Sequence, residues 1–394
     1  MIHSCHSIVV DGHDIQELLK AFSVARTIKD KPVALICKTF KGQGFPGIAD
    51  QDNWHGKPLG AKAKEVLEHL NAQLKAKDTS GHHLAPLKPK DDCSELKLMG
   101  SIKLPSAPQY KLGDQVATRL AYGNALARIG QTCDRVIALD GDTKNSTFSI
   151  KLRDVKPNQF IECFIAEQNL VGVAIGCGAR GRTIPFASTF AAFFTRAFDQ
   201  IRMGAVSQTN CNFAGSHVGV SIAERAVELA ANTPGVCYIR TGRPNQPVIY
   251  SPEESFSVGK GKVVRTAGAS ADHLTVVGGG ITISEALKAA DILATEKINI
   301  RVIDPFTIKP MDKDLLAKAV KETCNKVLTV EDHAPEGGIG DAVSAALSQS
   351  GVIHTVHRLG ITEIPHSGKP DELIAKYGID AKAIVRAVKT LLGK

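Results

Sequence analysis

The chain has 394 residues, of which 43% are apolar and 22% charged, and its formal net charge is +8. This composition excludes a mainly disordered chain, and the length predicts two or three domains. The longest mainly apolar stretch, at 170–179, is far shorter than the roughly 20 residues of a spanning helix, so no membrane partner is expected. The basic residues are dispersed and not interleaved with aromatics, which argues against nucleic acid and suits anionic small substrates.

Nine cysteines are scattered along the chain without any CxxC pair. This usage is typical of reduced thiols in a cytosolic protein, and it makes a zinc site improbable. The first residues, MIHSCHSIVVDGHD, lack the basic region of a secretory signal. The sequence therefore predicts a cytoplasmic protein.

The first segment contains one predicted βαβ unit, with strands at 7–10 and 33–38 and a helix near 15–26. Both strands are apolar on both faces, and a two-stranded parallel sheet cannot bury them. Either a partner chain covers this segment or the natural domain has lost its beginning. The alternative, in which these strands extend the next domain's sheet, is disfavoured by the long polar, proline-bearing linker at 78–111, which follows an amphipathic helix at 62–77.

The rest of the chain alternates continuous apolar runs with helical patterns, which predicts α/β layers with buried parallel strands. The predicted strands are 136–139, 160–166, 236–239, 274–277, 300–303 and 327–330, and the predicted helices include 114–129, 284–296 and 314–322. A boundary near 250–262 divides this part, so we expect domains at 1–110 (an incomplete domain with its linker), 111–250 and 251–394.

Two basic loops follow the first strands. KTFKGQG at 38–44 contains Lys41 and could present cations and backbone N–H groups to an anion, although a basic surface turn has the same composition. WHGK at 54–57 places His55 beside the only tryptophan, where a packed histidine is the common explanation and a functional loop is the alternative.

Two acidic positions follow strands of the middle domain. Asp140 and Asp142 end the strand at 136–139, where a metal site is conceivable but a turn is the favoured interpretation. Glu167 follows the strand at 160–166 and opens a helix. It could simply complement the helix dipole, or it could reach into the cleft and accept a proton or hydrogen bond from a ligand nitrogen.

Aromatic and basic side chains follow the other strands. Phe193 either packs in the core or stacks on a planar ring, His217 sits in a tight turn, and Arg240 and Arg243 form a plausible phosphate clamp. Each signal is weak alone. Their shared position after strands of one parallel sheet predicts a single anion-binding cleft, and hence an enzyme acting on a phosphorylated small molecule.

Taken together, these segments closely resemble the transketolase family, especially the animal enzyme and its transketolase-like paralogues. The matching motifs are VDGHD (10–14), KTFKGQG (38–44), WHGKP (54–58), ATRLAYG (117–123), LDGDTKNSTFS (139–149), FIECFIAEQN (160–169), STFAAFFTRAFDQIRM (188–203), GSHVGVS (215–221), RTGRP (240–244), INIRVIDPFTIKP (298–310), TVEDH (329–333) and EGGIG (336–340).

The resemblance implies the family's fold and reaction. The fold is a thiamine-diphosphate-binding α/β fold with parallel sheets in successive layers, plus a C-terminal transketolase-type α/β domain. The reaction transfers a two-carbon ketol unit from a ketose phosphate to an aldose phosphate in the pentose phosphate pathway. It uses thiamine diphosphate and a divalent cation, Mg²⁺ or another such as Ca²⁺.

The resemblance also implies roles for individual residues. Glu167 would be the carboxylate on the cofactor's aminopyrimidine ring, Phe193 would stack on that ring, and Lys41 would lie near the cofactor. His55 would contact both cofactor and substrate and act with Glu167 in catalysis. The sugar phosphate would be bound by a further set of side chains together with His55: Arg119, Ser146, His217 and Arg243. In the family these sites lie at a dimer interface.

The sequence departs from the family in two places. Most of the diphosphate-binding domain, with its metal motif, has no counterpart, so residues 1–110 are expected to be a remnant and no metal ligand is assigned. An intervening stretch is also missing where Val220-Ser-Ile222 runs into Ala223, which shortens the middle, pyrimidine-binding domain. We therefore expect a homodimer or pairing with a full-length subunit. The alternative function is a catalytically weak or inactive transketolase-like partner subunit, or an incomplete gene product.

Overall fold

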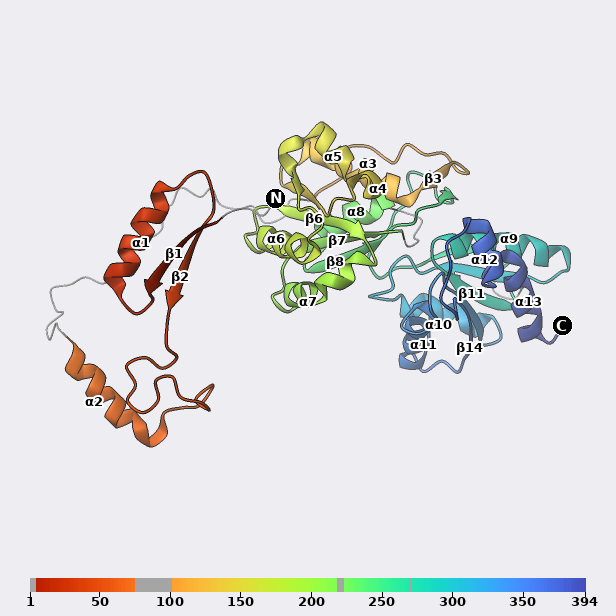
Figure 1. Cartoon of the computed structure of the whole chain (residues 1–394). Coiled ribbons are helices and arrows are strands. Elements are labelled where there is room, and N and C mark those ends of the chain that lie inside the picture. Colours follow the sequence, from red (N-terminus) through yellow and green to blue (C-terminus); the bar gives the residue numbers. More distant parts are fainter. Residues whose placement is uncertain (1–4, 75–100, 218–222, 269–270) are drawn as a thin grey trace. The chain divides into compact units, whose positions relative to one another are not determined.

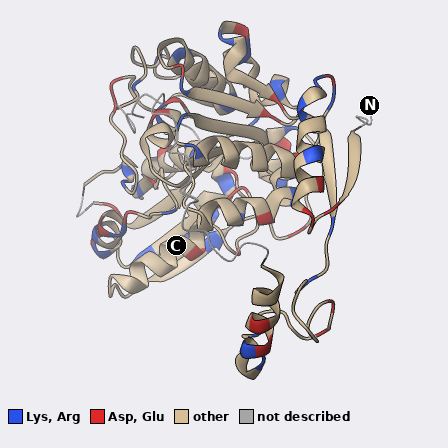
Figure 2. Ribbon diagram, turned by 90° about the vertical axis from the view of Figure 1, so that its left-hand side faces the viewer, with Lys and Arg blue, Asp and Glu red and all other residues tan. Residues whose placement is uncertain are grey.

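The computed structural model describes residues 5–74, 101–217, 223–268 and 271–394 (Figure 1). The chain divides into two compact units, Met1–Asp92 and Cys93–Lys394. Basic and acidic residues are interspersed along the helices and loops in Figure 2. Within the described ranges, every helix is too short or too polar to cross a membrane.

The first unit contains the predicted βαβ arrangement. Strands β1 (His6–Asp11) and β2 (Val33–Lys38) pair in parallel, and helix α1 (Ile15–Thr27) connects them. The helix begins where the sequence supplies a cap, because the Asp14 carboxylate accepts hydrogen bonds from two backbone N–H groups of its first turn. The second helix of this unit, α2, spans Ala63–Gln73 and follows a 3₁₀ turn, η1, at Gly60–Lys62. The last residues of its predicted range, 75–77, lie outside the described residues.

The sheet of the first unit leaves apolar side chains in solvent. Val9 and Ile36 are register partners in β1 and β2 and are 56% and 50% exposed. Leu19 and Phe22 of α1 are each 55% exposed. Among the described residues β1 and β2 pair with each other and form a sheet of two strands.

A five-stranded parallel sheet forms the middle domain, with strand order β5-β4-β6-β7-β8. Its strands are β4 (Val136–Asp140), β5 (Phe160–Glu162), β6 (Ile184–Phe190), β7 (Cys211–Ser216) and β8 (Val236–Arg240). Its helices are α3 (Thr118–Thr132), α4 (Lys144–Thr147), α5 (Ile150–Val155), α6 (Glu167–Ala179), α7 (Phe198–Val206) and α8 (Ala223–Asn232), with 3₁₀ turns η2 (Pro157–Gln159) and η3 (Phe193–Ala197).

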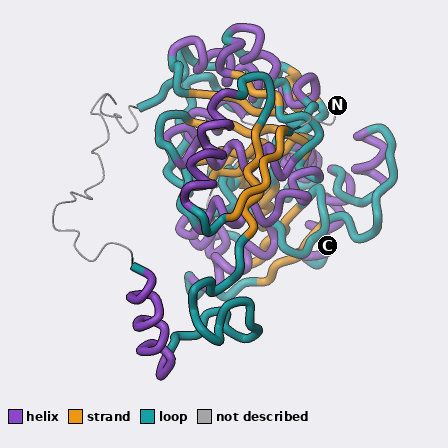
Figure 3. Tube along the Cα trace, turned by 60° about the vertical axis from the view of Figure 1, so that its left-hand side comes forward, coloured by secondary structure: helices purple, strands orange, loops and turns teal. Residues whose placement is uncertain are grey.

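Helices pack on both faces of this sheet. Figure 3 distinguishes the helices, strands and loops of the whole chain by colour. Val136 and Ala138 of β4 pack into one core cluster with α3, α5 and α8, whereas Ile137 and Leu139 pack into another with α6 and η3. The alternation follows from the strand period of two, so β4 must be apolar on both faces. Ile102, from the predicted linker, is also buried in the first cluster, so this part of the linker is not a free tether.

Two predicted boundaries of the middle domain are wrong. The strand predicted at 160–166 ends at Glu162, because Phe164 has a left-handed backbone (φ 56°) that a strand cannot accommodate. The helix predicted at 114–129 begins only at Thr118. The residues before it form β3 (Gln115–Ala117), which pairs antiparallel with β9 (Asn245–Pro247).

The C-terminal domain is a second α/β layer structure. Its sheet has the order β10-β12-β11-β13-β14, in which β10 is antiparallel and the other strands are parallel. The strands are β10 (Lys262–Arg265), β11 (Leu274–Gly278), β12 (Ile300–Asp304), β13 (Lys326–Val330) and β14 (Thr355–Leu359). The helices are α9 (Ile281–Thr295), α10 (Lys313–Glu322), α11 (Ile339–Gln349), α12 (Pro370–Lys376) and α13 (Ala381–Leu392).

Polar contacts join the middle and C-terminal domains. The Tyr250 hydroxyl donates to the buried Asp304 carboxylate at 2.8 Å, and the Ser284 hydroxyl donates to the Gln246 side chain at 3.1 Å. Arg240, at the end of β8, forms an ion pair with Asp332 at 3.4 Å. The ion pair between Arg240 and Asp332 brings the ends of β8 and β13 together beside the cavity described below.

Candidate functional site

The two basic loops of the first unit meet through Lys41 and His55. The Lys41 ammonium lies 3.1 Å from Nδ1 of His55, and both side chains are exposed. An ammonium group can only donate, so Nδ1 accepts and the neutral ring carries its proton on Nε2. This pairing presents a cation and an N–H donor side by side, as an anionic ligand requires.

His13 of VDGHD holds one of these loops. The backbone N–H of Phe40 donates to Nε2 of His13 at 2.8 Å, which ties the residue before Lys41 to the start of α1. The loop then folds back on itself, because the N–H of Asp50 donates to the carbonyl of Lys41 at 2.8 Å. The conformation around Lys41 is therefore fixed by two hydrogen bonds from outside its own turn.

Glu167 is the first residue of α6 and is only 4% exposed. Its Oε2 accepts a hydrogen bond from Arg196 of η3 at 2.7 Å, and the Arg196 side chain is 59% exposed. Oε1 has no hydrogen-bond partner among the described residues. The buried carboxylate thus keeps one oxygen available to a donor, and its existing partner is a surface side chain that can rotate away.

An aromatic row runs beside this carboxylate. Phe193, 44% exposed, stacks on Phe190 with ring centroids 4.9 Å apart and an interplanar angle of 16°. Phe190 in turn contacts the ring of His217 with a centroid distance of 3.9 Å. Phe193 and Arg196 both belong to η3, which packs on α6, so Glu167 and the exposed ring lie on adjoining elements. The row connects the predicted pyrimidine side of the site to the predicted sugar-phosphate side.

Arg119 is fixed by the loop that follows β4. Its guanidinium donates to the carbonyl of Ser146 at 2.8 Å and lies over the ring of Phe148, 5.1 Å from the centroid. The Arg119 Nε is buried without a hydrogen-bond partner in the described residues. Burial, and then the charge of the nearby Arg243, lowers the pKa of Arg119. A positive charge held in this way favours an anionic ligand.

The loop that carries Ser146 is organised by Asp140. This buried carboxylate accepts hydrogen bonds from Thr143, from the Thr147 hydroxyl at 2.7 Å and from the Ser149 hydroxyl at 2.8 Å. Burial raises the pKa of Asp140, and these hydrogen bonds oppose the rise. These hydrogen bonds organise the turn from Asp140 to Ser149 around a buried carboxylate.

His217 and Arg243 complete a cationic cluster with Arg119. His217 has a left-handed backbone (φ 68°) at the end of β7, and its Nδ1 lies 2.9 Å from the Ser216 hydroxyl. Burial first, and then the charges of Arg119 and Arg243, lower the pKa of His217 below its ordinary value. Arg243 is exposed and has no ion-pair partner among the described residues. The cluster therefore carries uncompensated positive charge.

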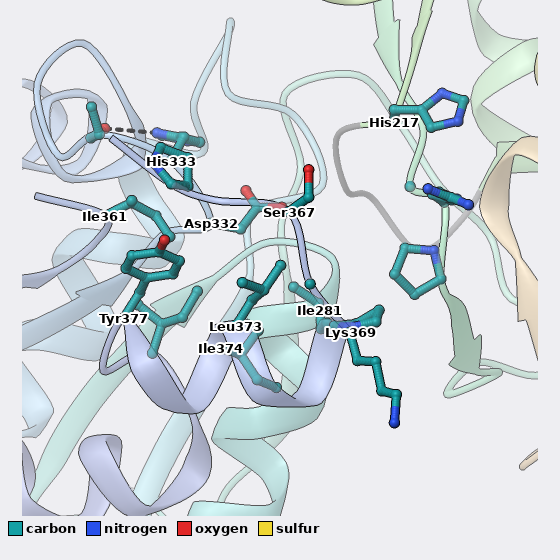
Figure 4. A pocket seen from close by; sticks show the side chains of 18 of the residues that line it. His217, Ile281, Asp332, His333, Ile361, Ser367, Lys369, Leu373, Ile374 and Tyr377 are labelled. Carbon is teal, nitrogen blue, oxygen red and sulfur yellow. Dashed lines mark hydrogen bonds between the residues drawn. The ribbon is translucent and has the colours of Figure 1, made fainter. Parts of the chain in front are cut away.

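This cluster opens into a cavity of about 1330 Å³ between the middle and C-terminal domains (Figure 4). Arg119, His217 and Arg243 line one side of it. The other side is formed by the loops that follow β13 and β14 and by α12. Carboxyl ends of parallel strands are where α/β proteins bind ligands, and in this cavity strand ends of two sheets meet.

Sequence reasoning missed several residues of this site. Arg196, Phe148 and Phe190 stood in quoted motifs without an assigned role, yet they contact Glu167, Arg119 and His217. A second missed group lies in the C-terminal domain and includes Asp332 and His333 of TVEDH. Their position directly after a buried strand was the available signal, the same one that selected Glu167.

Comparison with known proteins assigns the family. The chain matches the transketolase thiamine diphosphate binding domain at residues 3–76, the transketolase pyrimidine binding domain at 114–244 and the transketolase C-terminal domain at 259–384. The matches define the class as α/β proteins with a thiamine diphosphate binding domain.

Relatives narrow this class. The chain is 49% identical over 423 residues to the rat (Rattus norvegicus) protein "Transketolase", covering 99% of this chain and 66% of that protein. It is 47% identical to the bovine (Bos taurus) "Transketolase-like protein 1", with 99% of this chain and 70% of that protein covered. The chain belongs to the transketolase family. It thus spans about two thirds of the rat protein's length, and the 423 aligned positions outnumber its own 394 residues.

Two solved structures are similar in fold. The "Split gene transketolase, inactive beta4 tetramer" superposes with a TM-score of 0.64 at 35% identity, covering 70% of this chain and 98% of that one. The transketolase of Campylobacter jejuni gives a TM-score of 0.72 at 16% identity, covering 99% of this chain and 67% of that one. The predicted α/β fold with its C-terminal transketolase-type domain is confirmed. The domain limits and the roles of single residues stay predictions.

Proposed function

We propose that this chain takes part in transketolase chemistry, the transfer of a two-carbon ketol unit from a ketose phosphate to an aldose phosphate. The observation that carries this proposal is the cationic cluster of Arg119, His217 and Arg243 beside the row that leads to Glu167. It combines a phosphate-binding group with a buried carboxylate, and the family membership supplies the reaction. A coupled assay of ketol transfer, with Glu167→Gln as the comparison, tests it.

The sugar phosphate would bind with its phosphate at the two guanidinium groups. Arg119 is preorganised by the Ser146 carbonyl and the Phe148 ring, while Arg243 is exposed and free to close on the anion. His217 has a lowered pKa and is mainly neutral near pH 7. It can therefore accept or donate a hydrogen bond to a sugar hydroxyl without adding a third charge.

The residues around Glu167 fit the aminopyrimidine end of thiamine diphosphate. Glu167 has a carboxylate oxygen without a partner, and Phe193 offers an exposed ring face on an adjoining element. Glu167 would hold or move a proton at the ring nitrogen, Phe193 would stack, and Arg196 would yield its hydrogen bond. When bound, thiamine diphosphate supplies a carbon nucleophile and an electron sink.

The diphosphate end would be served by Lys41 and His55, which already lie together in the first unit. Divalent cations such as Mg²⁺ or Ca²⁺ accompany this cofactor in the family, and we propose the same requirement here. Within the described residues no group of three or more His, Cys, Asp or Glu side chains could hold a metal. We propose no metal ligand on this chain, because the family's metal motif has no counterpart in the sequence.

Exposed apolar surface on the middle domain supports assembly with a second subunit. Around the start of α6 and along α7, Phe164, Ile165, Phe198 and Val206 are 68%, 70%, 74% and 67% exposed. Helices α6 and α7 pack against each other, so these exposed apolar side chains lie on adjoining elements, as expected of an interaction surface. We propose a homodimer, or pairing with a full-length subunit, through this face, in the cytoplasm. Gel filtration with light scattering, comparing the wild type with Phe198→Asp, tests the assembly.

The second candidate is a catalytically weak or inactive partner subunit. The split-gene structure favours it, because a chain that superposes on 70% of this one forms a tetramer described as inactive. The discriminating experiment is calorimetric titration of the purified chain with thiamine diphosphate and Mg²⁺, followed by the transfer assay. Micromolar binding with turnover by the chain alone would exclude this candidate. Turnover that requires an added full-length subunit would support it.

A further inference from the structure

The cavity beyond the arginine cluster is larger and more apolar than a sugar phosphate needs. Its volume is about 1330 Å³, whereas pockets for drug-sized ligands are roughly 300–1,000 Å³. A sugar phosphate is smaller than such ligands and carries a hydroxyl on almost every carbon. It would fill only the end near Arg119 and Arg243, and it has no apolar surface to place against the opposite wall.

That opposite wall is an apolar shelf, which we define as Ile361, Leu373, Ile374 and Tyr377. Figure 4 shows these side chains gathered on one side of the cavity, with His217 on the other. The shelf comes from the loop after β14 and from α12, and none of the residues of α12 is buried. Ile361 and Ile374 also pack against the core of the C-terminal domain, so part of each side chain remains to line the cavity.

Polar groups line the same cavity as the shelf and the arginines. Asp332 and His333, after β13, and Ser367, before α12, line the cavity. Asp332 is held by Arg240 at 3.4 Å, and Nδ1 of His333 lies 2.7 Å from the Ala334 carbonyl. Asp332 and His333 are therefore fixed by neighbours and can recognise the polar edge of a flat ligand.

The shelf itself is anchored to the loop. The backbone N–H of His366 donates to the Tyr377 hydroxyl at 2.8 Å, which ties the loop before α12 to the last turn of that helix. The Tyr377 ring and the two aliphatic side chains of α12 then form one surface. A planar, mainly apolar ring system is the shape that such a surface accommodates.

We propose that this cavity binds a nucleoside phosphate, with its phosphate at Arg119 and Arg243 and its base on the apolar shelf. The chemical class of the ligand follows from the two ends of the cavity, the arginines and the apolar shelf. A ligand that contacts both ends must carry an anionic group and a flat heterocycle. This site goes beyond the proposed function. It shares with the proposed sugar-phosphate site only Arg119 and Arg243. A nucleoside phosphate bound there competes with a sugar phosphate.

The test measures binding of ADP and of ribose 5-phosphate to the purified full chain by calorimetry. ADP is expected to bind saturably, and ribose 5-phosphate to displace it. Adenosine has the base but no phosphate, and inorganic phosphate has the anion but no base. Each is expected to bind at least tenfold more weakly than ADP. Failure of ADP to saturate at millimolar concentration, or binding of ADP and ribose 5-phosphate at the same time, would overturn the proposal.

Variants separate the two ends. Leu373→Asn is expected to weaken the binding of ADP at least fivefold and to leave the binding of ribose 5-phosphate unchanged. Arg243→Ala is expected to weaken the binding of both ligands. Leu112→Asn is the matched control, since Leu112 is 65% exposed and does not line the cavity. Equal ADP affinity in the wild type and Leu373→Asn would refute the shelf. Binding of ADP without binding of ribose 5-phosphate would instead refute the sugar-phosphate site alone.

Discussion

Replacing the two cavity arginines should weaken sugar-phosphate binding unequally. Arg119 is already held by the Ser146 carbonyl at 2.8 Å and by the Phe148 ring, so little side-chain entropy is lost when it binds phosphate. Arg243 is exposed and must be ordered by the ligand. The structure therefore predicts that Arg119→Ala is the more damaging change.

The magnitudes follow from charge-assisted hydrogen bonds. A guanidinium–phosphate interaction in a partly buried site is worth about 2–3 kcal/mol, so Arg119→Ala should weaken binding roughly 30- to 150-fold. An exposed charge is screened by solvent and is worth about 1 kcal/mol, so Arg243→Ala should weaken binding roughly fivefold. The effect of Arg243→Ala should also shrink at high ionic strength.

The assay is calorimetric titration of each variant with ribose 5-phosphate, with thermal unfolding as a check on folding. Arg153→Ala serves as the matched control, because Arg153 is a surface arginine of α5 paired with its neighbour Asp154. The control should bind like the wild type. Wild-type affinity in Arg119→Ala, or a larger loss in Arg243→Ala than in Arg119→Ala, would refute the reasoning.

Three further predictions concern the same elements. His217 has a pKa lowered by burial and by Arg119 and Arg243, so the unfolded chain binds a proton first as the pH falls. Its contribution makes the native state lose stability as the pH falls below about 6.5, and NMR titration should show its pKa rising in Arg243→Ala. Gly123→Ala should destabilise the native state by about 1–3 kcal/mol, because a Cβ at this position overlaps the Phe148 carbonyl. Gly172→Ala should stabilise it by about 0.5–1 kcal/mol, because a Cβ there meets open space. Thermal unfolding of the two variants measures both effects. Ser149→Ala removes a donor from the buried Asp140 carboxylate and should cost about 1–3 kcal/mol in denaturant unfolding, with a shift in Ser146 visible as weaker sugar-phosphate binding.

Local patterns predicted the elements that depend on local physics. The run 136–139 is apolar at every position and forms β4, buried on both faces. Asp14 supplies the cap of α1, and Glu167 opens α6 at the predicted position. Each of these follows from a few neighbouring residues, which is why a sequence reading suffices for them.

Strands β6 and β7 were absent from the predicted apolar runs for a physical reason. They contain buried polar residues, among them Ser188, Thr189 and Asn212, whose hydroxyl and amide groups interrupt a hydrophobic pattern. Polar residues in a buried sheet point to function more than to stability. Ser188 and Thr189 lie near the carboxyl end of β6, whereas Asn212 lies near the start of β7 and lines a small pocket there.

Long-range pairings explain the remaining misses. Residues 115–117 read as the start of a helix, but they pair with β9, which lies far along the chain. The cavity wall from α12 and from the loop after β14 likewise meets Arg119 only through domain contacts such as Arg240 with Asp332. The hydrophobic periodicity of a short sequence segment carries no information about such long-range contacts. The site was predictable where it follows strands of one sheet and not where two domains meet.

The most direct test of the account is Glu167-dependent transfer of a labelled two-carbon unit. The chain would be mixed with thiamine diphosphate, Mg²⁺, a ¹³C-labelled ketose phosphate and ribose 5-phosphate, alone and with a full-length relative whose own glutamate at this position is replaced by glutamine. NMR would then follow the label. The account predicts labelled product in at least one arm and its loss in Glu167→Gln. Absence of product in both arms, or product that persists in Glu167→Gln, would contradict it.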